Sequence, residues 1–161
     1  MLLGLISDTH DNAPRTRKAL ALLQDAGAGH LLHAGDLQSG ALVPYFEGFQ
    51  VHLARGNVDA SGSIREAIQE TGAPIQYATL HELDLAGMRV GVIHGDDGAR
   101  LEGMINSGAF DVIVHGHTHT FRDIRVGETR VINPGAVHRS SEPSVATYDT
   151  ETGTLDRIFL T

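Results

Sequence analysis

The chain has 161 residues, a formal net charge of −8 and no cysteine, so disulfides and thiolate metal sites are excluded. Its length suits one domain spanning residues 1–161, large enough to bury roughly two-thirds of its unfolded surface. A single lysine, Lys18, and eleven scattered arginines form no basic stripe, which argues against a nucleic-acid partner.

The first half of the chain alternates short apolar runs with helix-forming segments. Residues 2–6 predict a buried strand, and residues 11–14 (Asp-Asn-Ala-Pro) are typical of a helix start, because a capping side chain precedes an early proline. Residues 63–66 have the form of a capping box, and the helix that follows is expected to end at Gly72. The other expected elements are a helix over 15–26, strands over 30–34 and 50–54, and a short helix over 41–47. This alternation predicts parallel strands with crossover helices.

The second half of the chain changes to hairpins. Residues 82–85 alternate, turn at Gly87 and return over 88–93, which predicts a hairpin. The elements expected after it are a short helix ending at 108, a buried strand over 111–114, and two hairpins with turns at 127–128 and 151–153. Parallel units followed by hairpins predict an α/β fold of two stacked mixed β-sheets flanked by helices, in four layers.

Acidic, amide and histidine side chains follow five of the expected apolar runs. The first pair, Asp8 and His10, is spaced i, i+2, so on an extended backbone both side chains point to the same face. The same arrangement recurs after later runs at Asp36, Asn57, His94, His117 and His119. Ligands in such α/β layouts lie outside the carboxyl ends of the strands. Oxygen and imidazole donors at that edge predict a metal centre, and their number is too large for one ion.

The order of these groups resembles that of a known family. The series Asp-x-His, Gly-Asp, Gly-Asn, His-Gly and Gly-His-x-His resembles the calcineurin-like metallophosphoesterases, and most closely their short bacterial and archaeal phosphodiesterases. The resemblance extends from Ser7 to Ala136 without a large insertion. Each motif alone has an ordinary explanation, such as a helix cap at Asp8 or a turn at Asn57. Their shared position after apolar runs favours a common site.

The resemblance implies a two-metal site in which Asp36 bridges the ions. Asp8, His10 and His119 would hold one ion, and Asn57, His94 and His117 would hold the other. The expected reaction is hydrolysis of a small phosphate ester, most of all a phosphodiester, by in-line attack of a hydroxide that bridges the two metals. Carboxylate, carboxamide and imidazole donors suit Mn²⁺, Fe, Zn²⁺ or Ni²⁺, and we expect Mn²⁺.

Other polar residues near the motifs are candidates to orient the ligands, since a ligating imidazole usually donates its second N–H to an acceptor. They are Asp11, Asn12, His33 and Asp59, with ordinary loop hydrogen bonding as the alternative. Protein phosphatases of the superfamily carry a histidine after the asparagine ligand, whereas Val58 stands there and cannot donate a proton. The short phosphodiesterases also lack that histidine. His115 and His138 are candidates to replace it, and an ordinary surface-loop role is the alternative for His138.

Three other functions stay open at this point. A phosphomonoesterase would use the same site, with Arg55 and Arg100 as cationic donors. A non-catalytic metal-binding scaffold of the same fold is the second, and the retention of all seven ligand positions favours an enzyme over it. A nuclease is the third, and the acidity of the chain counts against it.

The sequence also bears on location and assembly. The apolar start reaches Asp8 before the core of a signal peptide would be complete, and no apolar run approaches the length of a membrane span. We therefore expect a cytoplasmic protein without a membrane partner. The hairpin-rich carboxyl half could carry an apolar patch that a symmetric homodimer would cover.

Overall fold

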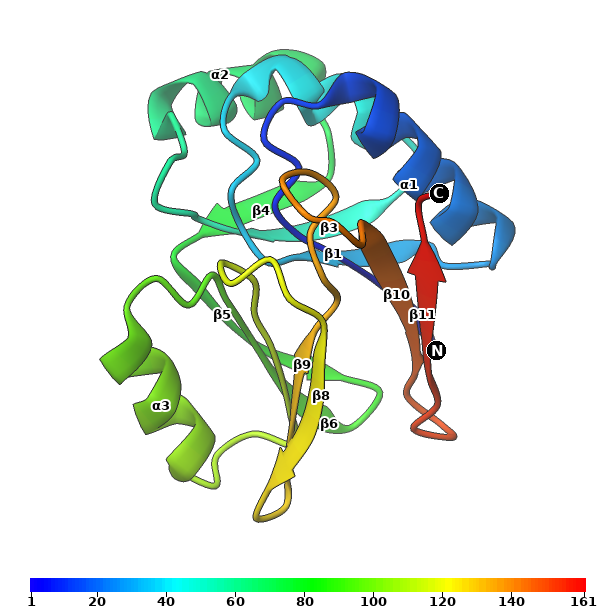
Figure 1. Cartoon of the computed structure of the whole chain (residues 1–161). Helices are drawn as coiled ribbons and strands as arrows, with labels where there is room; N and C mark the ends of the chain where they lie inside the picture. The colour runs from blue at the N-terminus through cyan, green and yellow to red at the C-terminus, as the bar shows by residue number, and fades with distance from the viewer.

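The computed structural model describes residues 1–161 as two stacked β-sheets with helices on both outer faces (Figure 1). Helices α1 (Ala13–Asp25) and α2 (Ser61–Thr71) and the 3₁₀ helix η1 (Gly40–Phe46) cover the first sheet. Helix α3 (Gly98–Asn106) covers the outer face of the second sheet. This arrangement confirms the predicted four-layer α/β fold of two mixed sheets flanked by helices.

The first sheet has the strand order β11-β10-β1-β2-β3-β4. Its first four strands in the chain pair in parallel, as the crossover helices predict. Strand β10 runs antiparallel beside β1, and β11 pairs antiparallel with β10 at the edge. The bounds are β1 Leu2–Ile6, β2 His30–His33, β3 Gln50–Ala54, β4 Ile75–Ala78, β10 Ser144–Asp149 and β11 Leu155–Phe159. The carboxyl-terminal hairpin thus completes the sheet that the amino terminus begins.

The second sheet has the strand order β5-β6-β7-β9-β8. Strands β6, β7 and β9 are parallel, and β5 and β8 close the two edges in antiparallel pairing. The bounds are β5 Leu80–Leu85, β6 Met88–Ile93, β7 Val112–Val114, β8 Arg122–Val126 and β9 Thr129–Asn133. The predicted hairpin turns at 86–87, 127–128 and 151–153 are all confirmed.

Three apolar clusters fill the spaces between the four layers. The largest joins Leu20, Leu31 and Phe46 between the helices and the first sheet. A second, which includes Leu5 and Val92, fills the space between the two sheets, and a third lies under α3. Burial in these layers, rather than helix propensity alone, holds the strands so that their carboxyl ends meet at one edge.

Three local predictions are wrong in detail. Strand β4 was not expected, because it is a four-residue strand at the edge of the sheet directly after Pro74. The capping box at 63–66 does not form: α2 begins at Ser61, and the Ser63 hydroxyl accepts a bond from the backbone of Gly40 instead. The short helix expected over 41–47 is a 3₁₀ helix that contains Pro44. None of the helices has the length and apolar character needed to cross a membrane.

Candidate metal centre

The predicted ligands lie on loops that leave the strands in an unusual backbone conformation. Five of them have a positive φ: Asp8 (55°), His10 (45°), Asp36 (56°), His117 (68°) and His119 (59°). Non-glycine residues seldom adopt this region, and such strain concentrates at functional sites. The side chains of Asp8 and His10 therefore come together because both residues have a left-handed backbone conformation. The extended backbone that the i, i+2 spacing predicted is not formed.

Four side chains form a compact group of potential metal donors. Asp8, His10, Asp36 and His119 each offer a donor atom, and these atoms all lie within 4.8 Å of one another. His119 Nε2 lies 3.1 Å from Asp8 Oδ1, and His10 Nε2 lies 3.6 Å from both Asp8 Oδ1 and Asp36 Oδ2. Three of the four side chains are buried, so the donors face one another and not bulk water.

The hydrogen bonds of this group fit a metal better than a polar network. Asp8 Oδ1 and both ring nitrogens of His10 are buried without a hydrogen-bond partner. Buried polar atoms are normally paired, because leaving one unpaired costs roughly 1–3 kcal/mol. A divalent cation would satisfy the unpaired carboxylate oxygen and an imidazole nitrogen together, so the residues present fit a metal ion.

A second set of donors meets around His94. Its Nδ1 donates to the carbonyl of Ala34 at 2.8 Å, which leaves Nε2 as the free donor atom. That Nε2 lies 3.0 Å from Asn57 Oδ1, 3.3 Å from His117 Nδ1 and 3.3 Å from Asp36 Oδ2. Asp36 Oδ2 thus lies between the two sets. The structure brings all seven sequence-predicted ligands to one place, at the carboxyl ends of the strands.

The electrostatics of the centre favour positive charge. Burial raises the pKa of Asp36, but hydrogen bonding and charge from His94 outweigh it and hold this pKa below the usual value. Burial lowers the pKa of His94, yet the Asp36 carboxylate and the Ala34 carbonyl raise it to about 9. Burial also raises the pKa of Asp8, but the nearby His10 ring, the Ser7 hydroxyl and the charges of His94 and His119 outweigh it and hold this pKa below the usual value. The Asp8 and Asp36 carboxylates are therefore ionised at neutral pH and attract cations.

Glycines let the loops approach the ligands closely. A Cβ on Gly56 would lie 2.0 Å from Asp36 Oδ1, and a Cβ on Gly35 would lie 2.6 Å from the His94 ring, where φ is also positive at 96°. A Cβ on Gly116 would lie 2.0 Å from Ser7 Oγ. The glycines of the Gly-Asp, Gly-Asn and Gly-His motifs are therefore required by packing against the site itself.

Two of the predicted orienting residues fix the loop that carries Asp36. Asp11 accepts bonds from the backbone and the hydroxyl of Ser39, at 3.2 and 2.8 Å. Asp59 accepts one backbone bond from Gln38 and one from Gly56, both at 2.7 Å. These carboxylates act on the loop backbone and not on the ligating imidazoles.

A third predicted orienting residue, His33, lies behind the site. It is fully buried, and burial lowers its pKa to about 4, which keeps the ring neutral. Its Nδ1 accepts the backbone N–H of Gly35 at 3.1 Å, so its Nε2 carries the proton and bonds to Thr9 Oγ1 at 3.2 Å. His33 therefore joins the turn after β2 to the loop after β1.

The two candidates for a proton donor have different surroundings. Asn12 caps α1 through its oxygen and bonds through Nδ2 to His138 Nδ1 at 3.0 Å. Nδ1 is then the acceptor, which leaves Nε2 of His138 as a donor, and the ring centroid lies 6.5 Å from that of His10. His115 is buried, and its Nε2 lies 3.4 Å from Arg122 Nη1. His138 thus has a free N–H near the predicted ligands, whereas both ring nitrogens of His115 have partners, the Gly116 carbonyl and Arg122.

Several groups that form hydrogen bonds with the predicted ligands could not be identified from the sequence. Ser7 Oγ donates to Asp8 Oδ2 at 2.5 Å, and its place directly before Asp8 is the only signal that could have suggested it. The carbonyl of Arg139 accepts from His119 Nδ1 at 3.0 Å, and a backbone carbonyl leaves no trace in sequence. Arg55 and Arg100 are exposed and form no hydrogen bond or ion pair with the ligand side chains.

Carboxylate, amide and imidazole donors gathered at the strand ends of this fold, with Asp8, His10 and Asp36 buried, define a metal-dependent hydrolase site. The sequence model of the calcineurin-like phosphoesterase superfamily domain matches residues 1–153. The chain therefore belongs to the calcineurin-like phosphoesterase superfamily, a family of metal-dependent enzymes that hydrolyse phosphate esters, as the motif order had indicated.

The chain is also similar to individual proteins of known sequence or structure. A phosphodiesterase of Methanocaldococcus jannaschii is 29% identical over 156 residues, covering 94% of each chain. The solved structure of an archaeal phosphodiesterase superposes with a TM-score of 0.91 at 28% identity, covering 99% of both chains. A phosphoesterase from E. coli shares the fold, with a TM-score of 0.73 at 23% identity and full coverage of both chains.

Proposed function

We propose that this phosphoesterase is a phosphodiesterase that works with two divalent ions, Mn²⁺ first among them. One ion would be held by Asp8, His10 and His119, the other by Asn57, His94 and His117, and both by Asp36. The observation that carries the proposal is the position of Asp36 Oδ2, 3.6 Å from His10 Nε2 and 3.3 Å from His94 Nε2. One carboxylate facing two donor sets is what a shared ligand requires. The similarity to phosphodiesterases supports the choice of a diester.

The ions would supply an activated water nucleophile and stabilise negative charge on the phosphate. The chain's own part is to hold the donors in place and to orient the ester. His94 and His119 each donate Nδ1–H to a backbone carbonyl, so their Nε2 atoms stay free to ligate. His138, held by Asn12, presents Nε2–H near this edge and would donate a hydrogen bond to a phosphoryl oxygen that stays on the phosphate.

The substrate class follows from charge and size. The chain has a formal charge of −8, so we propose a small phosphate ester and not a nucleic acid as substrate. A diester carries one negative charge, which the ions would balance without extra cations. This agrees with the lack of any bond between Arg55 or Arg100 and the predicted ligands. A cytoplasmic location and a symmetric homodimer stay predictions from the sequence.

The test compares hydrolysis of bis-p-nitrophenyl phosphate with that of p-nitrophenyl phosphate. Metal-stripped protein is assayed after addition of Mn²⁺, Zn²⁺, Ni²⁺ or Mg²⁺, and bound metal is counted by elemental analysis. We expect Mn²⁺ to restore diester cleavage most strongly, with two ions per chain. Asp36→Asn should lose activity and metal, whereas Asp156→Asn, on an exposed position of β11, should retain both. Faster monoester cleavage, or one ion per chain at saturation, would contradict the proposal.

A further inference from the structure

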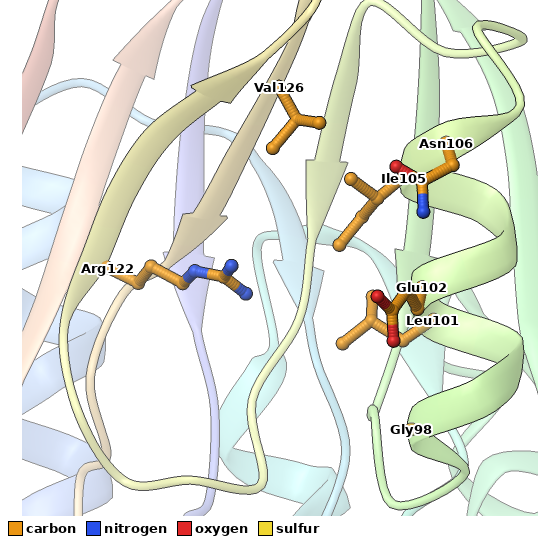
Figure 2. A pocket seen from close by; sticks show the side chains of 7 residues that line it. All are labelled: Gly98, Leu101, Glu102, Ile105, Asn106, Arg122 and Val126. Carbon is orange, nitrogen blue, oxygen red and sulfur yellow. The ribbon is translucent and has the colours of Figure 1, made fainter.

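A cavity of about 380 Å³ lies between α3 and β8, separate from the predicted metal ligands (Figure 2). Its floor is apolar and its rim is polar. The residues that line it are Gly98, Leu101, Glu102, Ile105 and Asn106 from α3, and Arg122 and Val126 from β8. Three of the seven lining residues are hydrophobic, and small-molecule sites combine such apolar side chains with polar groups that fix the orientation of the ligand.

Arg122 is the cationic group of this cavity. Figure 2 shows its side chain extending from β8 toward α3. It forms no ion pair, and its one hydrogen-bond contact is with His115 Nε2, at 3.4 Å. The neighbouring Arg130, by contrast, forms a two-pronged pair with Asp123, at 2.8 and 2.9 Å. A half-buried guanidinium without a carboxylate, in a chain this acidic, is available to bind a carboxylate or phosphate group.

The opposite rim carries the acceptor groups. Glu102 and Asn106 are spaced i, i+4 on α3, so both lie on the same side of the helix. Neither side chain forms a hydrogen bond within the protein, and Glu102 is not paired with Arg122. A ligand lying across the cavity would therefore meet a cation on one rim and a carboxylate with a carboxamide on the other.

The apolar floor of the cavity is the third feature that a ligand has to match. Leu101 and Ile105 belong to the apolar cluster under α3, and Val126 packs against it. An aliphatic group that enters the cavity would cover the part of these side chains that is still exposed and remove it from water. A ligand that matches all three features has an anionic group, an ammonium group and an aliphatic side chain.

We propose that this cavity binds a small zwitterion with an aliphatic side chain, the chemistry of an aliphatic α-amino acid. The carboxylate would accept two bonds from Arg122, and the ammonium would donate to Glu102 and Asn106. The site is close to the metal centre without being part of it. His115, which contacts Arg122, precedes Gly116, and the Gly116 backbone packs against Ser7 and Asp8.

The test is a titration followed by methyl NMR on the metal-loaded protein, with Zn²⁺ used because it is diamagnetic. The probe is L-leucine, and its two partial analogues are isocaproate, which lacks the ammonium, and isoamylamine, which lacks the carboxylate. We expect saturable shifts at the methyl groups of Leu101, Ile105 and Val126. Leucine should bind more tightly than either analogue, because each analogue loses one charged contact.

Three variants assign the contacts. Arg122→Gln and Glu102→Gln should each raise the Kd for leucine at least about tenfold, the usual scale for a lost charge-assisted bond. Arg125→Gln is the matched control, because Arg125 lies on the same strand but on its other face, where it bonds to the carbonyl of Glu128. Its Kd should equal that of the wild type.

Three results would overturn the proposal. The first is the absence of any saturable methyl shift up to about 10 mM leucine, because a Kd above this concentration would be too weak for specific binding. The second is a Kd that neither Arg122→Gln nor Glu102→Gln changes. The third is shifts confined to residues beside His94, which would mean that leucine only chelates the bound metal. Glu102 is exposed, so we expect Glu102→Gln to fold. If Arg122→Gln does not fold, the Kd of Glu102→Gln still decides the test.

Discussion

The carboxylate of Asp59 accepts the backbone N–H of Gly56 at 2.7 Å, three residues before it in the chain. Its other oxygen accepts the backbone N–H of Gln38, also at 2.7 Å. Gln38 follows Asp36 by two residues, and Gly56 directly precedes Asn57. One half-buried carboxylate therefore sets the separation between the loop that carries Asp36 and the loop that carries Asn57.

Replacing Asp59 with asparagine should loosen the metal centre. The amide would offer one oxygen where two N–H groups need acceptors, and its NH₂ group would face a donor. Loss of such a supporting contact typically costs 10- to 100-fold in metal affinity. Mn²⁺ titration of Asp59→Asn should show a loss of about this size. Asp84→Asn is the control, because Asp84 accepts a backbone bond from Gly87 in a distant hairpin. Equal metal affinity in the two variants would contradict this role for Asp59.

The predicted ligands could be located from sequence because each one lies within a short motif at the end of an apolar run. The fold class was readable for a related reason, since buried parallel strands appear as continuous apolar runs. The strand order was not readable. Placing β10 beside β1 is a pairing between the two ends of the chain, and no local pattern records it.

The supporting contacts could not be predicted for the same reason. His94 is oriented by the carbonyl of Ala34, which lies sixty residues earlier in the chain. Ser63 looked like a helix cap because capping is a local pattern, but a long-range bond to Gly40 takes its hydroxyl. Local motifs therefore identified the ligands, whereas the contacts that orient them depend on tertiary packing.

Gly56→Ala should disrupt the metal centre. The new methyl group would lie 2.0 Å from Asp36 Oδ1 and 2.2 Å from the backbone nitrogen of Asp36, and backbone atoms cannot move aside cheaply. We expect a loss of about 1–3 kcal/mol in the free energy of unfolding, as for overpacked sites, together with weaker metal binding. Urea unfolding with and without Mn²⁺ measures both effects.

A second glycine supplies the control for this substitution. Gly62 lies in α2, and a Cβ there would meet nothing within 4 Å. Because alanine favours a helix over glycine, Gly62→Ala should stabilise the protein by roughly 0.5–1 kcal/mol. If both variants shifted the urea midpoint in the same direction, the close approach of Gly56 to Asp36 would not be the cause of the destabilisation in Gly56→Ala.

His52 should make the stability of the fold depend on pH. Its Nδ1 lies 2.8 Å from His30 Nε2, and its ring centroid lies 5.2 Å from that of His81. Burial and the neighbouring imidazoles lower its pKa from 6.5 to about 4. The unfolded chain therefore binds a proton more readily, so this contribution to stability is present above pH 6.5 and is lost as the pH falls toward 4. The urea midpoint should fall less steeply over this range in His52→Gln than in the wild type, and parallel curves would contradict the assignment.

Val58 should leave the enzyme dependent on the quality of the leaving group. The side chain stands where a protonating histidine is found in related phosphatases, is 42% exposed, and has no proton to give. We expect the rate of diester hydrolysis to fall steeply as the pKa of the leaving alcohol rises. A general acid typically contributes 10²- to 10⁴-fold, so Val58→His should raise the ratio of alkyl to aryl diester cleavage by about tenfold or more. Val58→Gln, which is polar but does not titrate, is the matched control. A flat dependence in the wild type would show that another group, such as His138, already donates the proton.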